Sequence, residues 1–241
     1  VFGNNDTPGV MLSSAAKEYL KVYGVLVGKK PLIFTNNDSG YETAIEFKKN
    51  GVDPIILDTR KDPKSEIIDE AKKLDIQIKF SYVVVAAKGY KKVKSAEVAK
   101  ISDDKNELGT LETINCDCIC VSGFWTPTIH LASQSGNKTT FNKDIDAFVP
   151  GISKQNETTL GAANGTFTLE ETLKNSFESG YELSKKITNN DNKTSSPIVM
   201  EKKSTTHDKF WCVPLPKGKT YKRFLDFQND VAVSDIEIAL K

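Results

Sequence analysis

The residues best suited to bind a ligand form a polar turn that follows a short apolar segment. Residues 31–35 read PLIFT, and the turn TNNDSG occupies residues 35–40. Between a strand and a helix, a glycine-rich turn lets backbone N–H groups approach the pyrophosphate of a dinucleotide. Here only Gly40 remains, and Asp38 adds a carboxylate beside the phosphate position. The turn therefore offers a phosphate neither the space nor the charge that it needs.

Asp58 and Arg60 stand at the end of the next apolar segment, residues 54–58. In a dinucleotide-binding βαβ unit, an acidic residue at this point binds the ribose, and an arginine accommodates the 2′-phosphate of NADP. Half of this fingerprint is a weak signal when it stands alone. We interpret the unit as a structural Rossmann unit without a nucleotide.

The side chains of the turn are expected to satisfy the following helix from within the chain. Asp38 or Ser39 is placed to cap the helix, and Asn36 or Asn37 can bond the local backbone as an Asx turn. The positive end of the helix dipole stabilises a carboxylate at this position. We therefore predict that Asp38 or its neighbours occupy the phosphate position, and that neither NAD nor NADP binds this unit.

Three of the four cysteines alternate along one predicted strand, in the sequence INCDCICVSG. Cys116, Cys118 and Cys120 form a C-x-C-x-C pattern that cannot wrap a metal ion when it lies on a flat strand. We interpret them as buried small hydrophobic residues. Unpaired cysteines suit a reducing cytoplasm, so we predict four free thiols, Cys212 included, and a cytoplasmic location.

No other residue pattern indicates catalysis or a metal site. Asp226 and Asp230 lack the alternating oxygen ligands and the glycine of a calcium loop, which favours a structural turn. His130 and His207 have no partners nearby in the sequence, and the chain contains no G-x-S-x-G, H-E-x-x-H or P-loop motif. We expect no catalytic residue and no metal ligand in this chain.

The spacing of apolar residues predicts the elements that position the turn. Helices are expected at residues 11–23, from about 40 to 50, and at 64–74, with strands at 31–35, 54–58, 76–87, 90–101, 108–114 and 114–121. Residues 28–123 thus give βαβαβ, a β-hairpin and a final buried strand. The predicted fold class is α/β, with a Rossmann-like (FAD/NAD(P)-binding, disulfide-reductase-like) domain that carries a β-hairpin insertion, plus part of a second dinucleotide-binding domain.

The same pattern divides the chain into five parts. After residue 123 the chain is expected to return to an outer dinucleotide-binding domain, where Thr168 and Glu171 form a capping box at the start of a helix. The predicted parts are an initial segment and helix of that outer domain (residues 1–27), the inserted Rossmann-like domain (28–123), the return (124–187), a polar linker (188–208) and a tail (209–241).

Composition excludes several classes of partner. The chain has 241 residues and a net charge of +1 at pH 7, so nothing favours nucleic acid or an anionic membrane. No apolar run approaches the roughly 18 residues of a membrane-spanning helix. The sequence begins VFGNNDTPGV without a leader, which we interpret as a piece of a longer protein.

Six stretches resemble the α subunit of heterotetrameric, folate-linked sarcosine oxidase. They read NNDTPGVMLSSAAKEYL, IFTNNDSGYETA, CVSGFWTPTIHLASQSG, AFVPG, GAANGTFTL and FLDFQNDVAVSDIEIA. They are spread over nearly the whole chain and include unusual strings such as TNNDS and DFQNDV. The resemblance covers only the middle of such a subunit, since the family's first glycine-rich strand and its folate-binding domain would lie outside.

The resemblance implies a reaction, cofactors and partners. Such a complex demethylates sarcosine oxidatively to glycine, forms hydrogen peroxide and passes the one-carbon unit to tetrahydrofolate. The flavins and the oxidation site are associated mainly with the β subunit, while the α subunit holds NAD and assembles with the β, γ and δ subunits. The family's NAD-closing stretch matches residues 161–169, which implies cofactor-binding roles for Ala162, Ala163, Phe167, Thr168 and Leu169.

Taken alone, the chain is then a scaffold and half of an NAD site, without oxidase activity or flavin. Two alternatives stay open. An independent NAD(P)-dependent oxidoreductase related to disulfide reductases would require a redox cysteine pair and an intact glycine fingerprint, and the sequence has neither. A protein-interaction module is the third interpretation.

Overall fold

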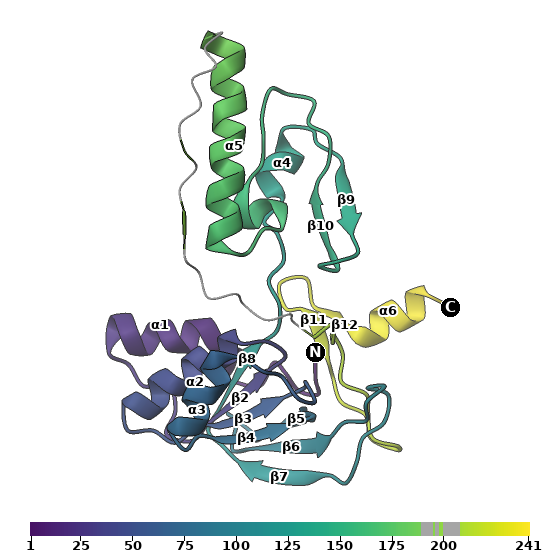
Figure 1. Cartoon of the computed structure of the whole chain (residues 1–241). Helices are drawn as coiled ribbons and strands as arrows, with labels where there is room; N and C mark the ends of the chain where they lie inside the picture. The colour runs from purple at the N-terminus through teal and green to yellow at the C-terminus, as the bar shows by residue number, and fades with distance from the viewer. Residues whose placement is uncertain (189–194, 196–197, 200–207) are drawn as a thin grey trace. The chain divides into compact units, whose positions relative to one another are not determined.

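The computed structural model describes residues 1–188, 195, 198–199 and 208–241. Two compact units are present, the first formed by Val1–Phe124 with Thr205–Lys241 and the second by Trp125–Ser204 (Figure 1). The predicted polar linker, residues 188–208, falls almost entirely outside the described residues. No helix in the described part of the chain is both long and apolar enough to cross a membrane.

A five-stranded parallel sheet forms the centre of the first unit. Its order is β1-β8-β2-β3-β4, with β1 at Val10–Leu12, β8 at Cys118–Ser122, β2 at Pro31–Thr35, β3 at Ile55–Asp58 and β4 at Gln77–Phe80. Helices α1 (Ser13–Tyr23), α2 (Ser39–Lys49) and α3 (Glu66–Lys73) follow β1, β2 and β3. This is the parallel βαβ arrangement that the apolar periodicity predicts.

The two faces of the parallel sheet bury different partners. Ile33 and Ile56 belong to the apolar cluster under the helices, whereas Leu32 and Leu57 belong to a cluster shared with a second sheet. This alternation is the expected consequence of a strand with both faces buried. Figure 1 shows the helices on one side of the parallel sheet and the second sheet on the other.

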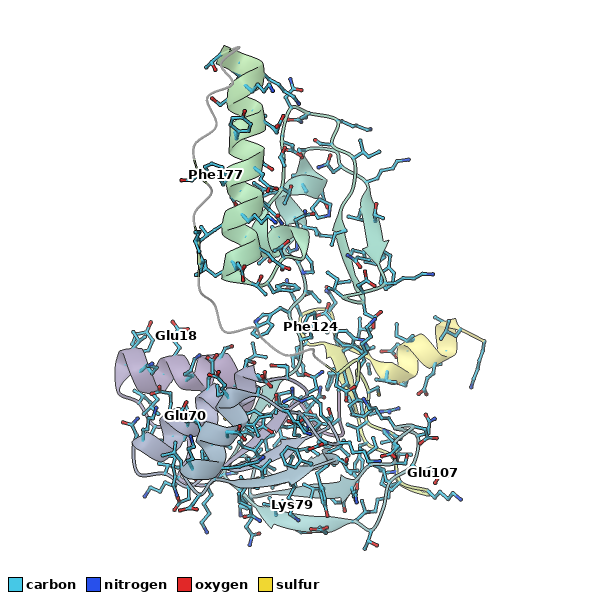
Figure 2. The ribbon with its side chains drawn as sticks, viewed as in Figure 1. Glu18, Glu70, Lys79, Glu107, Phe124 and Phe177 are labelled. Atoms are coloured by element: carbon cyan, nitrogen blue, oxygen red, sulfur yellow. The ribbon has the colours of Figure 1, made fainter. Side chains whose placement is uncertain are left out.

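The second sheet is antiparallel and contains β5 (Tyr82–Lys88), β6 (Ser95–Lys100) and β7 (Glu112–Asn115). The hairpin insertion is therefore confirmed, although β6 begins later than the predicted strand at 90–101. Lys79 of the parallel sheet, which is labelled in Figure 2, pairs with Glu112 of β7 at 2.6 Å and joins the two sheets.

Two predicted strands were wrong. The predicted strand at residues 114–121 is divided between β7 and β8, so Cys116 lies in the bend between them and not on one strand with Cys118 and Cys120. The apolar run at residues 76–87 is not a single strand, because the chain turns at Ser81 with φ at +55° and divides the run into β4 and β5. Ser81 donates its N–H to the Arg60 carbonyl and accepts from the Ile101 N–H at 2.7 Å. Long-range backbone bonds thus hold a left-handed residue that carries no glycine signal.

The second unit contains α4 (His130–Gln134), a hairpin of β9 (Thr139–Asn142) and β10 (Ala147–Pro150), a short 3₁₀ helix at Gly161–Asn164, and α5 (Leu169–Thr188). Thr168 precedes α5 as predicted, and its Oγ accepts the Glu171 N–H at 3.3 Å. No residue of α5 is fully buried among those described.

The C-terminal residues contain β11 (Phe224–Asp226), β12 (Val231–Ala232) and α6 (Val233–Ala239). The Asn5 side chain both donates to and accepts from the Phe224 backbone at 2.9 Å, which joins this module to the start of the first unit. Asp226 accepts from the N–H groups of Gln228 and Asn229, so the Asp-Phe-Gln-Asn-Asp stretch forms the predicted structural turn.

All four cysteines are unpaired. Cys118 and Cys120 lie fully buried under the helices, with their sulfur atoms 3.5 Å apart. Burial raises the pKa of Cys116 to about 12, and the contact with Cys118 together with burial raises the pKa of Cys120. Because the thiolate is the reactive form, the raised pKa values protect Cys116 and Cys120. The hydrogen bond with Cys120 lowers the pKa of Cys118, which is shielded from reagents by its complete burial.

We therefore expect a thiol reagent at pH 8 to modify Cys212, the half-buried cysteine, in the folded chain and all four cysteines after denaturation. Mass spectrometry of the labelled peptides checks both counts. Fewer than four labelled cysteines after denaturation without reductant would contradict the prediction that all are reduced.

Candidate functional site

The candidate site lies where β2, β3 and β8 end, at the carboxyl edge of the parallel sheet. Ligands of open α/β sheets bind at this edge, at the point where the strand order reverses. The strand order reverses between β2 and β8, which are neighbours in the sheet although they are far apart in the sequence. Their ends are close enough for the hydroxyl groups of Ser39 and Ser122, 83 residues apart, to share a hydrogen bond. The site is therefore formed by the turn after β2 and by the residues that follow β3 and β8.

Gly40 lets α2 begin very close to β2. A Cβ atom at Gly40 would lie 2.6 Å from the Cβ atom of Thr35 and 2.7 Å from its Oγ atom. In nucleotide-binding turns, the third glycine has this same role in close helix–strand packing. The turn thus has the packing glycine, while the three positions beside the phosphate, Asn36, Asn37 and Asp38, carry side chains.

Asn37 fills the space beside the helix N-terminus. Its Oδ1 accepts from the Ser39 N–H at 2.9 Å and from the Ser39 hydroxyl at 2.7 Å, which confirms the predicted Asx turn. Its Nδ2 donates to the Gly123 carbonyl and, at 3.4 Å, to the Ser122 carbonyl. The Asn37 side chain is only 3% exposed, so one amide bridges the ends of β2 and β8.

Asp58 and Arg60 bind each other. Asp58 is fully buried and accepts hydrogen bonds from Arg60 Nε, Nη2 and backbone N–H at 2.8–3.2 Å, and from the Tyr41 hydroxyl at 2.6 Å. Arg60 Nη1 donates to Asp38 Oδ1 at 2.8 Å. The ribose position and the 2′-phosphate position of a nucleotide site are therefore occupied by one internal ion network.

The predicted helix cap is partly wrong. Asp38 stands at the cap position of α2, but its side chain makes no capping hydrogen bond there. The Asp38 carboxylate instead pairs with Arg60, because a guanidinium is a stronger partner than a neutral N–H. Asn37 supplies the oxygen that Asp38 was expected to supply.

This network is unsuited to acid–base chemistry near neutral pH. Burial and the adjacent Asp58 carboxylate raise the pKa of Tyr41 far above its usual value. Burial alone would lower the pKa of Arg60, but its hydrogen bonds to Asp58 and Asp38 raise that pKa instead. Tyr41 therefore stays a neutral donor and Arg60 stays a cation.

Asp208, from the C-terminal part of the chain, contacts residues at the edge of the site. Its N–H donates to the Asn36 carbonyl at 3.0 Å, and its own carbonyl accepts from Asn36 Nδ2 at 2.7 Å. Its carboxylate accepts from the Thr59 hydroxyl at 3.1 Å and pairs with Lys105. Nothing in the local sequence signals these contacts, because the partners lie more than 100 residues away.

Two openings lie at this edge. A shallow cleft of about 450 Å³ is lined by Thr59, Arg60, Lys61, Ser81, Ser102, Asp103, Lys105 and Asp208. A second space of only about 50 Å³ lies between the strand ends, against Phe210 and Val213. The second space, which lies where the strand order reverses, is thus too small for a dinucleotide, which needs several hundred cubic ångströms.

The five residues assigned by resemblance lie together in the second unit. Ala162 and Ala163 are in the short 3₁₀ helix, Phe167 and Thr168 follow it, and Leu169 opens α5. Ala162 and Leu169 are exposed, and the Phe167 ring lies 6.4 Å from that of Trp125. This stretch leads into a helix N-terminus, where backbone N–H groups favour an anion.

Among the described residues, no group of three or more histidine, cysteine or acidic side chains could hold a metal ion. No family model matches the chain.

Curated sequences are similar along nearly the whole chain. Sarcosine oxidase subunit alpha from Rhizobium meliloti (strain 1021) is 34% identical over 248 residues, which cover 100% of this chain and 23% of the relative. The subunit of the same name from Corynebacterium sp. (strain P-1) is 28% identical and covers 98% of this chain and 25% of the relative. The predicted resemblance is confirmed, and the chain spans about a quarter of the length of these relatives.

Solved structures confirm the fold. The flavoprotein disulfide reductase RclA from Escherichia coli superposes with a TM-score of 0.54 at 14% identity, over 80% of this chain and 42% of its own. Lactococcus lactis thioredoxin reductase gives a TM-score of 0.53 at 14% identity, over 69% and 54%. At this identity the likeness establishes the Rossmann-like, disulfide-reductase-like fold and nothing finer.

Proposed function

We propose that this chain is part of the alpha subunit of a sarcosine oxidase complex and acts there as a scaffold. The complex would oxidise sarcosine to glycine with formation of hydrogen peroxide and methylene-tetrahydrofolate, together with β, γ and δ subunits in the cytoplasm. Similarity to sarcosine oxidase subunit alpha over the whole chain supports the assignment. Flavin and tetrahydrofolate would bind elsewhere in the complex.

The filled turn of the first unit is the observation that supports a scaffold role. A phosphate at the start of α2 would collide with the Asn37 side chain and meet the Asp38 carboxylate. The cation that could compensate, Arg60, is already held by two carboxylates. The residues of this turn do not fit a nucleotide, so we assign no cofactor to the first unit.

NAD fits the second unit better. Ala162 and Ala163 present small side chains before the start of α5, whose first turn offers backbone N–H groups but also carries Glu170 and Glu171. The two alanines, with Phe167, Thr168 and Leu169, would hold the pyrophosphate of NAD together with further parts of the subunit. NAD is a hydride carrier, but the residues described here would bind and orient it without taking part in a reaction.

Calorimetry with NAD and NADP tests the closed turn. We expect no binding of either nucleotide to residues 28–123 at concentrations up to about 1 mM. The buried Asn37 side chain and the Asp38 carboxylate would both have to move before a phosphate could bind. The double substitution Asn37→Gly with Asp38→Gly should gain measurable affinity for NADP, since it removes the Asn37 side chain that fills the turn and one of the two carboxylates that bind Arg60.

Asp103→Gly is the matched control for this test, because it removes the same charge from the adjacent cleft and leaves the turn intact. It should leave binding undetectable. Micromolar binding by the unchanged chain, with chemical-shift changes at residues 35–40, would show that the turn is an active nucleotide site.

An independent NAD(P)-dependent oxidoreductase is the less favoured alternative. Such an enzyme needs a redox pair of cysteines beside its cofactor. Cys118 and Cys120 are the nearest pair of thiols, but they are fully buried in the cluster under α1 and α2. Oxidation of NADPH by the chain in the presence of a disulfide substrate would favour this alternative over the scaffold role.

A further inference from the structure

Five exposed lysines gather at the end of the first unit opposite the candidate site. Lys29 and Lys30 precede β2, and Lys91, Lys92 and Lys94 lie in the loop between β5 and β6. Both loops bind the same bend before β8, because the Cys116 N–H donates to the Lys94 carbonyl and the Asp117 N–H donates to the Lys30 carbonyl. The two lysine-bearing loops are therefore neighbours, and we name the five residues the basic patch.

The loop between β5 and β6 is held in a fixed conformation. Val93 is fully buried and donates its N–H to the Pro8 carbonyl at 2.8 Å, while Lys94 donates its N–H to the Lys88 carbonyl at 2.8 Å. Gly89 has φ at +156°, and a Cβ atom there would lie 1.9 Å from the Lys92 carbonyl oxygen. This tight closure presents the tip of the loop, Tyr90, with 92% of its surface exposed.

The charge of the basic patch is not neutralised within the described residues. None of its five ammonium groups forms an ion pair there. Asp53 is balanced by Lys48, whereas Asp117 accepts only the neutral backbone N–H groups of Lys29 and Lys30, both at 2.8 Å, and keeps its charge. Asp117 and the exposed Asp6 therefore offset at most two of the five charges, and the patch stays basic.

Most other lysines of the first unit form ion pairs. Those that form ion pairs are Lys17, Lys21, Lys48, Lys49, Lys61, Lys64, Lys72, Lys79, Lys88, Lys105, Lys219 and Lys222. The net charge of the whole chain is only +1, so a cluster of unpaired lysines makes its charge distribution uneven, with excess positive charge at this end. Concentrated unpaired charge on a rigid loop favours association with a surface of opposite sign.

We propose that the basic patch, with Tyr90 at its centre, is a docking surface for an acidic face of another polypeptide. An exposed tyrosine on a fixed loop can supply the buried aromatic contact of an interface, and the lysines supply orientation and steering. That the partner is a further subunit of the same complex rests on the proposed function, whereas the preference for an acidic polypeptide does not.

The patch suits a protein better than a nucleic acid or a lipid surface. Single-stranded nucleic acid is bound by several aromatic side chains that stack successive bases along a groove, and this patch has one tyrosine on a protruding loop. A membrane surface is bound by many basic residues together with a broad apolar face. The patch itself has one exposed large apolar side chain, Tyr90, and the partly exposed Val25 and Leu26 precede Lys29.

A titration of the isotope-labelled chain with poly-L-glutamate in 50 mM salt tests the proposal, with NMR signals assigned to the patch as the readout. We expect the amide signals of both lysine loops and the ring of Tyr90 to shift. The triple substitution of Lys91, Lys92 and Lys94 by glutamine should weaken binding about tenfold, and added salt should weaken it further. Replacing Lys72, Lys73 and Lys100 by glutamine removes the same charge away from the patch and should change the affinity less than about twofold.

Three outcomes would overturn the proposal. The first is no binding of poly-L-glutamate in 50 mM salt, and the second is an equal loss of affinity in the patch variant and the control. The third is tighter binding of an oligothymidylate or of phosphatidylserine vesicles than of poly-L-glutamate through the same lysines. None of these results would bear on the nucleotide turn, whose calorimetric test stands separately.

Discussion

Replacing Asp58 with alanine is expected to lower the free energy of unfolding by about 3–5 kcal/mol, the usual cost of removing one partner of a buried ion pair. Asp58 has no exposed surface, and Arg60 is only 9% exposed. The substitution would leave the Arg60 cation with Asp38, whose own side chain is 14% exposed, as its remaining carboxylate in this network. It would also remove the acceptor of the Tyr41 hydroxyl, which is fully buried.

Urea unfolding followed by circular dichroism measures the effect. Asp103→Ala is the matched control, because the Lys61–Asp103 pair has a comparable separation of 2.6 Å but is more than 70% exposed on both sides. Water and salt screen such a pair, so its loss should cost about 0–1 kcal/mol. If Asp58→Ala and Asp103→Ala cost the same, the internal network is not what stabilises the carboxyl edge of the sheet.

The elements nearest to the site were predictable from sequence because short apolar runs and their spacing encode them. Residues 31–34 are apolar and, together with Thr35, form β2, whose five residues are all buried. The helix after the turn ends before Gly51, which has φ at +78° and is suited to a left-handed position. Both features are local, so a single sequence contains enough information to place them.

The contacts that define the site depend on residues far apart in the chain, and local patterns do not contain them. Asp38 meets Arg60, 22 residues later, and so does not cap the helix with its side chain. Asp208 meets Asn36 across 172 residues. Ser81 adopts a positive φ without being glycine because Arg60 and Ile101 bind its backbone. In each case a tertiary partner overrides the local preference.

The filled turn also shows which part of a nucleotide fingerprint serves the fold and which part serves the ligand. The phosphate-facing positions have become Asn36, Asn37 and Asp38, and their side chains bond to the strand ends and to Arg60. The packing position has stayed glycine. Gly40 is therefore expected to stabilise the fold through close packing against β2, independently of any ligand.

Gly40→Ala is therefore expected to destabilise the first unit by about 1–2 kcal/mol, against the ordinary trend. Alanine in a helix is normally more stable than glycine by roughly 0.5–1 kcal/mol. At Gly40, however, the new methyl group would lie 2.6 Å from the Thr35 Cβ atom, and overpacking of this kind typically costs about 1–3 kcal/mol. The close neighbour is a Cβ atom on a central strand, which cannot move aside without displacing the backbone.

Gly180→Ala supplies the contrast, because Gly180 is also helical, lies within α5, and has open space within 4 Å of the position that a methyl group would take. There the helix preference acts alone, and we expect a gain of roughly 0.5–1 kcal/mol. Native-state amide exchange, read separately for α2 and α5, reports the stability of each helix. Faster exchange in α2 of Gly40→Ala with slower exchange in α5 of Gly180→Ala is the expected pair of results. An unchanged or slower α2 exchange would mean that Gly40 is not retained for close packing against β2.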